Sequence, residues 1–393
     1  MIGRLLGLGL GLGLTALLVA GPAMAQDKVK VGFVATFSGP GGVLGKHLHD
    51  GFMLGIDHSG GKLGGLVPEV IQEDDRLAPD VGLQVAKKLI ERDKVDVMAG
   101  VIFSNVMMAI YKPVVDAGVP FISSNAGPSP IAGAQCSPMF FSTSWQNDGA
   151  HEAMGKHAQD KGYKNVYLMA PNYQAGKDAL AGFKRFFKGT VADEVYTTVN
   201  QLDYSAEITQ LRAAKPDAVY VFYPGGMGIN FVKQYGQAGL TSQVPLLSAF
   251  TIDSTTLPAQ GDAAIGTFTT AFWAIDLKNA VNEKFVADYQ KKYNEIPSTY
   301  SAQAYDTALM LNAAIKDAGG KVSDKKALAA ALKKASFDSV RGGKLKLNTN
   351  NIPIQNFYLL ETVKRADGKL ISSVRATVLT DHSDAYAKDC PMK

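Results

Sequence analysis

Apolar runs alternate with amphipathic stretches along the first third of the chain. The apolar runs have the length of buried strands, and the stretches between them carry apolar residues at helical spacing. Such alternation is typical of βαβ units, which form a parallel sheet. The pattern predicts strands at 29–37, 69–73, 95–102 and 120–123, and helices at 45–58, 79–92 and 105–117.

The alternation begins again after residue 150, which indicates a second unit of the same kind. Residues 140–144 lie between the two units and are a candidate crossover. We therefore expect an α/β protein with two doubly wound α/β lobes joined by crossover strands. In the second unit the predicted helices are 151–161, 176–188, 205–214 and 227–237, and the predicted strands are 165–170, 195–198, 218–223 and 245–249.

The last third of the chain has a different order. Amphipathic helices are predicted at 281–293, 299–318 and 324–336, and a β-hairpin is predicted at 357–362 and 370–378. Because these segments follow both sheets, we expect each lobe to receive one of them, with several crossings that permit a hinge. The expected domains are lobe 1 at 26–143 and 275–350, and lobe 2 at 144–274 and 351–393.

The first 25 residues have the pattern of a secretory signal peptide. Arg4 precedes an uncharged stretch at 5–19, and Ala23-Met24-Ala25 forms an A-x-A cleavage site. The alternative is a membrane anchor, but the run is short and rich in glycine for a span of about 20 residues. No later segment is long and uncharged enough to cross a bilayer, so we expect an exported, soluble protein.

Charge and cysteine content exclude further classes of function. The formal net charge is +4 and the basic residues are dispersed, so nothing indicates nucleic-acid binding. The two cysteines, Cys136 and Cys390, show no further ligands of a zinc-type cluster. In an oxidising compartment they are expected to form a disulfide that ties the C-terminal tail to the first third of the chain. Two buried free thiols are the alternative.

The glycine-rich stretch after the first strand does not have the spacing of a nucleotide site. A Walker loop needs Ser or Thr after its Gly-Lys pair, but Gly45-Lys46 is followed by His47. The glycines at 39–45 also do not have the G-x-G-x-x-G spacing of a dinucleotide-binding turn. We expect no cofactor. The first turn of the following helix still offers free N–H groups and a positive dipole end to an anion such as a carboxylate.

Hydrolysis is the main enzymatic alternative. The sequence has no G-x-S-x-G elbow and no H-E-x-x-H motif. Glu73-Asp74-Asp75 end a strand and could do acid–base chemistry, but such clusters more often cap a helix or lie in solvent. We find no nucleophile–base–orienter set, so we expect no catalytic residues, no metal and no enzyme. An exported α/β hydrolase remains the more distant alternative.

Strand-to-helix corners recur along both units. Ligands of doubly wound sheets bind at the carboxyl ends of the strands, so facing units would bring these corners to one cleft. Any single corner could equally be an ordinary loop. The corners lie at 36–45, 101–105, 123–128, 171–176, 223–226 and 249–251.

The mature chain resembles the leucine/isoleucine/valine-binding proteins, which have the type I periplasmic fold of ABC importers. The stretches that carry the resemblance are VKVGFVATFSGPGGVLGKHLHDGFMLG, GVPFISSNAGPSPIAGAQCSPMFFSTSWQND, FVADYQKKYNEIPSTYSAQAYDTALMLNAAIKDAGG and VRGGKLKLNTNNIPIQNFYLLE. The resemblance implies a periplasmic, monomeric receptor that captures a small solute between its lobes and delivers it to an inner-membrane permease.

The resemblance also implies ligand contacts at the corners. Phe103-Ser104 and Asn125-Ala126-Gly127 match the segments that hold a ligand carboxylate, and Tyr173 matches an aromatic residue that closes over the ligand. Two departures stand out. Amino-acid binders usually have threonine at the position of Gly127, and they have an acidic residue after a strand where this chain reads Phe250-Thr251, with Asp253 slightly beyond. Tyr223 completes the set of candidate contacts.

These departures favour a ligand without an ammonium group, because a buried ammonium needs a counter-charge. Aromatic residues at the corners suit a flat apolar body, and the segments NNIPIQNFY and DHSDAYAKDCPMK resemble the subgroup associated with aromatic carboxylates. We expect Ser104, Asn125 and nearby N–H groups to hold a carboxylate, and Phe103, Tyr173 and Phe250 to enclose a benzoate or cinnamate relative. The alternative is a branched-chain amino acid or small amide.

Overall fold

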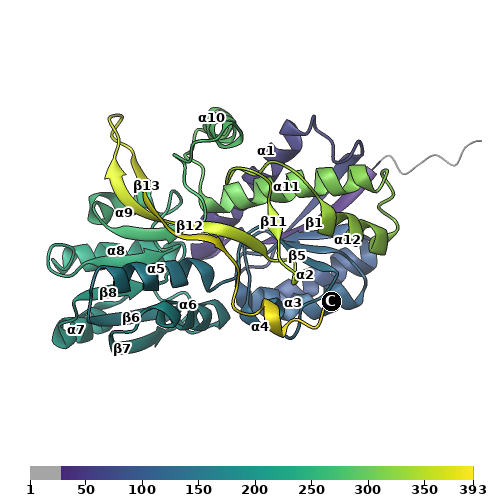
Figure 1. Ribbon diagram of the computed structural model, residues 1–393. Helices are drawn as coiled ribbons and strands as arrows, with labels where there is room; N and C mark the ends of the chain where they lie inside the picture. Colours follow the sequence, from purple (N-terminus) through teal and green to yellow (C-terminus); the bar gives the residue numbers. More distant parts are fainter. Residues whose placement is uncertain (1–27, 393) are drawn as a thin grey trace, which may run out of the picture.

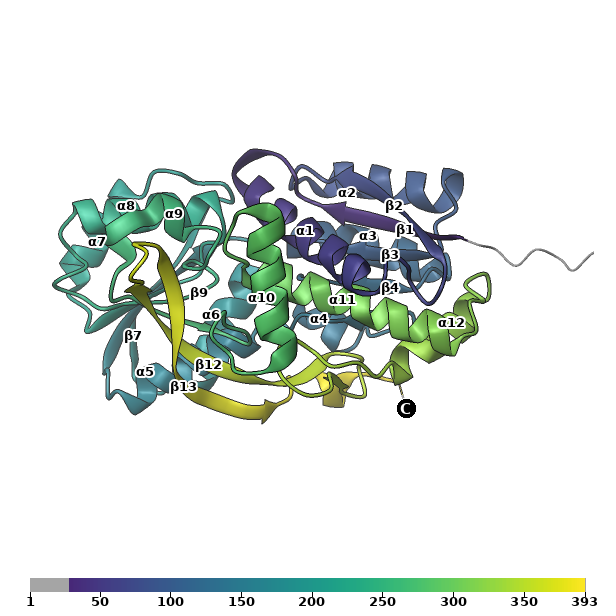
Figure 2. The same ribbon diagram turned by 90° about the horizontal axis from the view of Figure 1, so that it is seen from above.

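The computed structural model describes residues 28–392, and it shows two α/β lobes side by side (Figures 1 and 2). The predicted signal peptide lies outside the described residues. Among those described, no helix combines the length and apolar character that crossing a membrane requires. The two doubly wound lobes agree with the fold class that the alternating pattern predicts.

The first lobe is built on a parallel sheet with the strand order β2-β1-β3-β4-β5. β1 is mostly buried and β3, β4 and β5 are fully buried because helices follow the strands as crossover connections, whereas β2 at the sheet edge is only partly buried. The strands are β1 (Lys28–Ala35), β2 (Val67–Asp74), β3 (Val97–Gly100), β4 (Phe121–Ser123) and β5 (Phe140–Ser142), and the helices are α1 (Gly42–His58), α2 (Pro79–Lys87), α3 (Ser104–Asp116) and α4 (Ser129–Ala132).

The second sheet has the order β11-β12-β10-β9-β8-β6-β7, with β13 paired to β12. β6 to β10 are parallel, and the hairpin β12–β13 is antiparallel. The strands are β6 (Asn165–Pro171), β7 (Thr190–Thr197), β8 (Ala218–Val221), β9 (Leu246–Ala249), β10 (Phe268–Ala271), β11 (Lys346–Leu347), β12 (Pro353–Lys364) and β13 (Leu370–His382), and the helices are α5 (Gly149–Asp160), α6 (Gln174–Phe186), α7 (Ser205–Ala214), α8 (Gly226–Gln237) and α9 (Leu257–Gln260).

Three late helices return to the first lobe. α11 (Thr299–Asp317) packs along α1, with α10 (Ala280–Tyr293) and α12 (Lys325–Lys334) beside it (Figure 2). The chain then enters the second sheet again through β12. The predicted order of sheet, sheet, helices and hairpin is therefore observed.

Some elements differ from the predicted bounds. Residues 140–142 form β5 at the edge of the first sheet, so the crossover proper begins only after Ser142. β7 begins at Thr190, five residues before the predicted start. The prediction missed these residues because they lie at the sheet edge, are only partly buried and contain no apolar run. The pattern did not predict the short strands β10 and β11, which offer few residues to read.

The crossover segments lie against one another between the lobes. Arg341 donates to the Thr143 carbonyl and, at 3.1 Å, to Gln355 Oε1. Gln355 Nε2 in turn donates to the Ser144 carbonyl at 2.9 Å. These bonds hold the segments that pass between the lobes against one another.

The C-terminal tail forms a further link between the lobes. After β13 it runs back to the loop that follows α4, where Cys390 is disulfide-bonded to Cys136 with a Cα–Cα distance of 5.6 Å. The predicted disulfide is thus present. On the way, Tyr386 donates to Asp148 at 2.9 Å and Asn350 donates to Asp384 at 3.1 Å. The tail is therefore fixed by covalent and polar contacts at both lobes.

Candidate functional site

A small pocket lies between the two lobes, and its cavity volume of about 10 Å³ leaves room for about one water molecule in this conformation. Most of its walls come from the segments that follow β3, β4, β5, β6, β8 and β9, which is where a doubly wound sheet binds its ligands. The lining residues are Ile102, Phe103, Ser104, Asn125, Trp145, Asn147, Tyr173, Ala175, Phe222, Pro224, Phe250 and Tyr300.

Five of the candidate contacts line this pocket, namely Phe103, Ser104, Asn125, Tyr173 and Phe250. The other four do not. Ala126 is buried behind the first-lobe wall, and Gly127 packs against the backbone of Trp145. Tyr223 and Thr251 lie in the second-lobe core, where Thr251 Oγ1 accepts from the Tyr223 N–H at 2.8 Å. Successive residues of extended chain point to opposite faces, so Phe222 rather than Tyr223 faces the pocket.

Four of the lining residues lie outside the corners that were predicted from the sequence. Trp145 and Asn147 follow β5, whose carboxyl end was interpreted as part of a crossover. Phe222 precedes the corner residue that was chosen. Tyr300 lies in the first turn of α11, far from any strand end, so only the docking of this helix brings it to the pocket.

Six of the twelve residues that line the pocket are aromatic. Tyr173 and Phe222 are nearly parallel, with ring centroids 6.3 Å apart and an interplanar angle of 18°. The ring centroids of Trp145 and Phe250 are 4.1 Å apart. Phe250 has a φ of 56°, an uncommon left-handed conformation for a bulky residue that reorients the chain after β9. These walls suit a flat apolar body.

Polar groups approach the pocket from the first-lobe side. The Asn125 amide donates to the Ile102 carbonyl at 2.6 Å and accepts from Gln303 at 2.7 Å, so it is largely engaged within the protein. Ser104 Oγ accepts from Asn147 at 3.0 Å, which leaves its hydroxyl proton able to donate to a ligand. Ser104 is therefore the better placed side chain for an anionic group.

Helix N-termini add positive potential at the same place. α3 begins at Ser104, α6 begins directly after Tyr173, and α8 begins two residues after Pro224. The first N–H groups of a helix have no intrahelical acceptor, and the helix dipole is positive at this end. The pocket thus favours negative charge without any lining lysine or arginine.

No lining residue is acidic, and all of them belong to the described part of the chain. Asp253 lines a neighbouring cavity with Thr269 and Trp273 instead, and its Oδ1 accepts from Thr255 N at 2.7 Å. Burial raises the pKa of Asp253 to about 6. An ammonium group in the pocket would find no counter-charge in its walls.

The sequence matches the family model described as "Periplasmic binding protein" over residues 28–369. The chain belongs to the periplasmic binding protein family. It is 31% identical to Leu/Ile/Val-binding protein homolog 6 of Brucella melitensis, over 90% of this chain and 93% of that one.

Solved structures of other periplasmic binding proteins have the same fold. A solute-binding protein of an ABC transporter from R. palustris, in complex with benzoate, is 33% identical with a TM-score of 0.87 and covers 93% of this chain and 99% of its own. One from Rhodopseudomonas palustris BisB5, in complex with 3,4-dihydroxybenzoic acid, is 31% identical with a TM-score of 0.84 and covers 90% and 99%. The family and these neighbours are solute-binding proteins.

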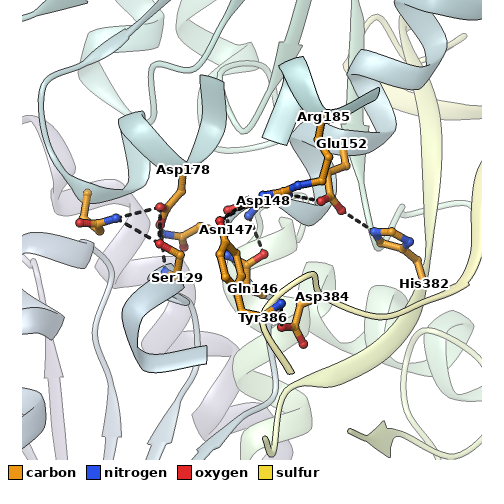
Figure 3. A network of polar contacts seen from close by, with 11 residues as sticks. Ser129, Gln146, Asn147, Asp148, Glu152, Asp178, Arg185, His382, Asp384 and Tyr386 are labelled. Carbon is orange, nitrogen blue, oxygen red and sulfur yellow. Dashed lines mark hydrogen bonds and ion pairs between the residues drawn. The ribbon is translucent and has the colours of Figure 1, made fainter. Parts of the chain in front are cut away.

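In this periplasmic binding protein the lobes are joined beside the pocket by a clasp, which we define as Asp178, Ser129, Asn147 and Gln174. Figure 3 labels Asp178, Ser129 and Asn147. Asp178 of the second lobe accepts from Ser129 of the first lobe, from Oγ at 2.7 Å and from N at 3.1 Å. It also accepts from Asn147 at 2.9 Å and Gln174 at 2.8 Å. Because Asn147 also bonds to Ser104, the clasp is directly connected to the pocket wall.

The glycine-rich turn before α1 makes a second contact between the lobes. A Cβ added at Gly226, the first residue of α8, would lie only 2.7 Å from Cβ of Pro40. The absence of side chains therefore lets the turn meet the second lobe closely. In this binding protein the turn at 38–45 therefore lies directly against the first turn of α8 in the second lobe.

Gly127, where amino-acid binders usually have threonine, is required by packing. A Cβ there would lie 2.1 Å from the Trp145 carbonyl oxygen, a distance that real contacts do not reach. We expect Gly127→Ala to displace Trp145 and to weaken ligand binding at least tenfold, measured by calorimetry. A Gly127→Ala variant that binds as tightly as the wild type would contradict this account.

Proposed function

We propose that this protein captures one small aromatic carboxylate between its lobes in the periplasm and delivers it to an ABC permease. It acts as a monomer, performs no chemistry on the ligand and uses no cofactor. The observation that carries the proposal is the pocket: aromatic walls, three helix N-termini and no acidic lining residue.

The proposed binding mode places the two ends of the ligand differently. The carboxylate lies at the first turn of α3, where Ser104 Oγ and backbone N–H groups donate to it. The ring lies among Phe103, Tyr173 and Phe222. Contacts to both lobes at once stabilise the closed form, and the benzoate complex of the similar R. palustris protein supports this ligand class.

The test is calorimetry with the mature protein against benzoate, hydroxybenzoates and leucine. We expect one aromatic acid to bind with 1:1 stoichiometry and leucine not to bind. At a ligand concentration 100 times Kd, the free energy of unfolding should rise by about 2.7 kcal/mol, which thermal unfolding detects. Tight binding of leucine, with no binding of any aromatic acid, would overturn the proposal.

A further inference from the structure

Asn147 lies in the crossover after β5, and its side-chain amide bonds in three directions. Its Nδ2 donates to Ser104 Oγ at 3.0 Å and to Asp178 Oδ2 at 2.9 Å, and its Oδ1 accepts from the Gly127 N–H at 2.9 Å. Ser104 lines the pocket, and Asp178 belongs to α6 of the second lobe (Figure 3). One amide therefore contacts the pocket wall and the opposite lobe at the same time.

These contacts fix the orientation of the Asn147 amide. Turning the amide over would place its oxygen against the Asp178 carboxylate, which accepts hydrogen bonds, and its NH₂ group against the Gly127 N–H, which donates one. No more than 4% of Ser104, Asn147 or Asp178 is exposed, so water does not compensate for such a mismatch. The NH₂ group of Asn147 therefore donates to both Ser104 and Asp178.

The fixed amide in turn sets the direction of the Ser104 hydroxyl. A hydroxyl that accepts from Asn147 keeps its own proton for a third group, such as a ligand carboxylate. If the amide were turned over, the proton would be directed to Asn147 Oδ1 instead, and the pocket would lose a donor. The donor that Ser104 offers to a ligand therefore depends on Asp178, which holds the amide from the second lobe.

The contact between the lobes is what brings Asp178 to this amide. Asp178 Oδ1 accepts from Ser129 Oγ at 2.7 Å, and Oδ2 accepts from the Ser129 N–H at 3.1 Å beside the bond from Asn147. The carboxylate thus lies against the first lobe and against Asn147 together. Hydrogen bonds in a buried chain polarise one another, so each bond in this series strengthens its neighbours.

We propose that Asn147 is a positioning residue that couples binding of a ligand carboxylate at Ser104 to closure of the lobes at Asp178. The inference rests on the proposed function and deepens it, because it assigns the contact through which the ligand site and the clasp influence each other. Such coupling is reciprocal: closure improves the hydrogen bond to the carboxylate, and a bound carboxylate favours closure by the same factor.

The experiment measures how much Ser104→Ala weakens binding in four backgrounds: wild type, Asp178→Ala, Asn147→Ala and the Asp178→Ala/Asn147→Ala double variant. The probe is benzoate or 4-hydroxybenzoate, whichever binds the wild type more tightly, and calorimetry gives the affinity. Ser104→Ala should weaken binding about tenfold in the wild type but about threefold or less in Asp178→Ala. In Asn147→Ala the loss should be the same whether or not Asp178 is present.

Asn312→Ala is the matched control background. Asn312 Oδ1 also accepts from a glycine N–H, that of Gly64, at 2.9 Å, but Asn312 does not line the pocket. In this background the effect of Ser104→Ala should depend on Asp178 as it does in the wild type. A substitution that only loosens the packing of the protein would not separate the two asparagines in this way.

Hydrogen exchange at the Ser129 N–H measures the same coupling from the side of the clasp. Ser129 lies between Pro128 and Pro130, so its amide is the one that exchanges in this tripeptide. Saturating ligand should slow this exchange at least tenfold in the wild type and about threefold or less in Asn147→Ala.

Two outcomes would overturn the inference alone: a Ser104→Ala effect that is equal with and without Asp178 in the wild type, or a dependence on Asp178 that persists in Asn147→Ala. If Asn147→Ala does not fold, Asn147→Ser, whose side chain is one bond shorter than the amide, takes its place. A wild type that binds no aromatic acid would instead refute the proposed function, and this inference with it.

Discussion

Replacing Cys136 and Cys390 together with serine is expected to lower the free energy of unfolding by up to about 5 kcal/mol. The bond joins residues separated by 254 positions, so its loss gives the unfolded chain much more conformational freedom. Urea unfolding of the mature protein measures the change, with the midpoint as the readout.

Dithiothreitol provides the control for this experiment. It should destabilise the wild type by a similar amount and should leave the double serine variant unchanged. The polar contacts of Tyr386 and Asp384 remain in both cases, so the tail is not expected to detach from the native protein entirely. A variant with the wild-type midpoint would show that the disulfide adds no stability.

Replacing Asp178 with alanine is expected to weaken ligand binding about 30- to 100-fold. The substitution leaves the Ser129 N–H and hydroxyl without their charged acceptor, and hydrogen bonds to charged groups contribute about 1.5–3 kcal/mol. Because these bonds join the two lobes, their loss disfavours the closed form without removing a pocket wall. Calorimetry gives the affinity, and small-angle scattering with saturating ligand gives the degree of closure.

Asp160→Ala is the matched control for the clasp. Asp160 lies in the same lobe, but it is exposed and pairs only with Lys156 one helical turn away, an arrangement that contributes little to stability. The Asp160→Ala variant should bind the ligand with the affinity of the wild type. An Asp178→Ala variant that binds as tightly as Asp160→Ala would show that the clasp does not hold the lobes together.

The arrangement of strands and helices could be predicted from local patterns, because strand and helix periods differ and each element is long enough to show its period. The short strands β10 and β11 could not be predicted, since β10 reads Phe-Thr-Thr-Ala and has no apolar run, and β11 has only two residues. β7 was foreseen only in part because its first half is held by pairing with β6 rather than by burial of an apolar run.

The site divides in a similar way. Phe103, Ser104 and Tyr173 were accessible to prediction because they follow directly on strand ends, whose side of the sheet is fixed by topology. The sequence could not decide between Phe222 and Tyr223, because a shift of one residue along the chain decides which of the two side chains faces the pocket. Tyr300 reaches the pocket through the docking of α11 onto the first lobe, which no local pattern contains.

The Cys136–Cys390 pairing also has a consequence for biogenesis. Cys136 is synthesised 254 residues before its partner, so it cannot pair with Cys390 until the second lobe, the three late helices and the β12–β13 hairpin have been made. Since the sequence contains only these two cysteines, the oxidising catalyst can form no incorrect intramolecular bond. Formation of this bond therefore needs an oxidant but no rearrangement between alternative intramolecular pairings.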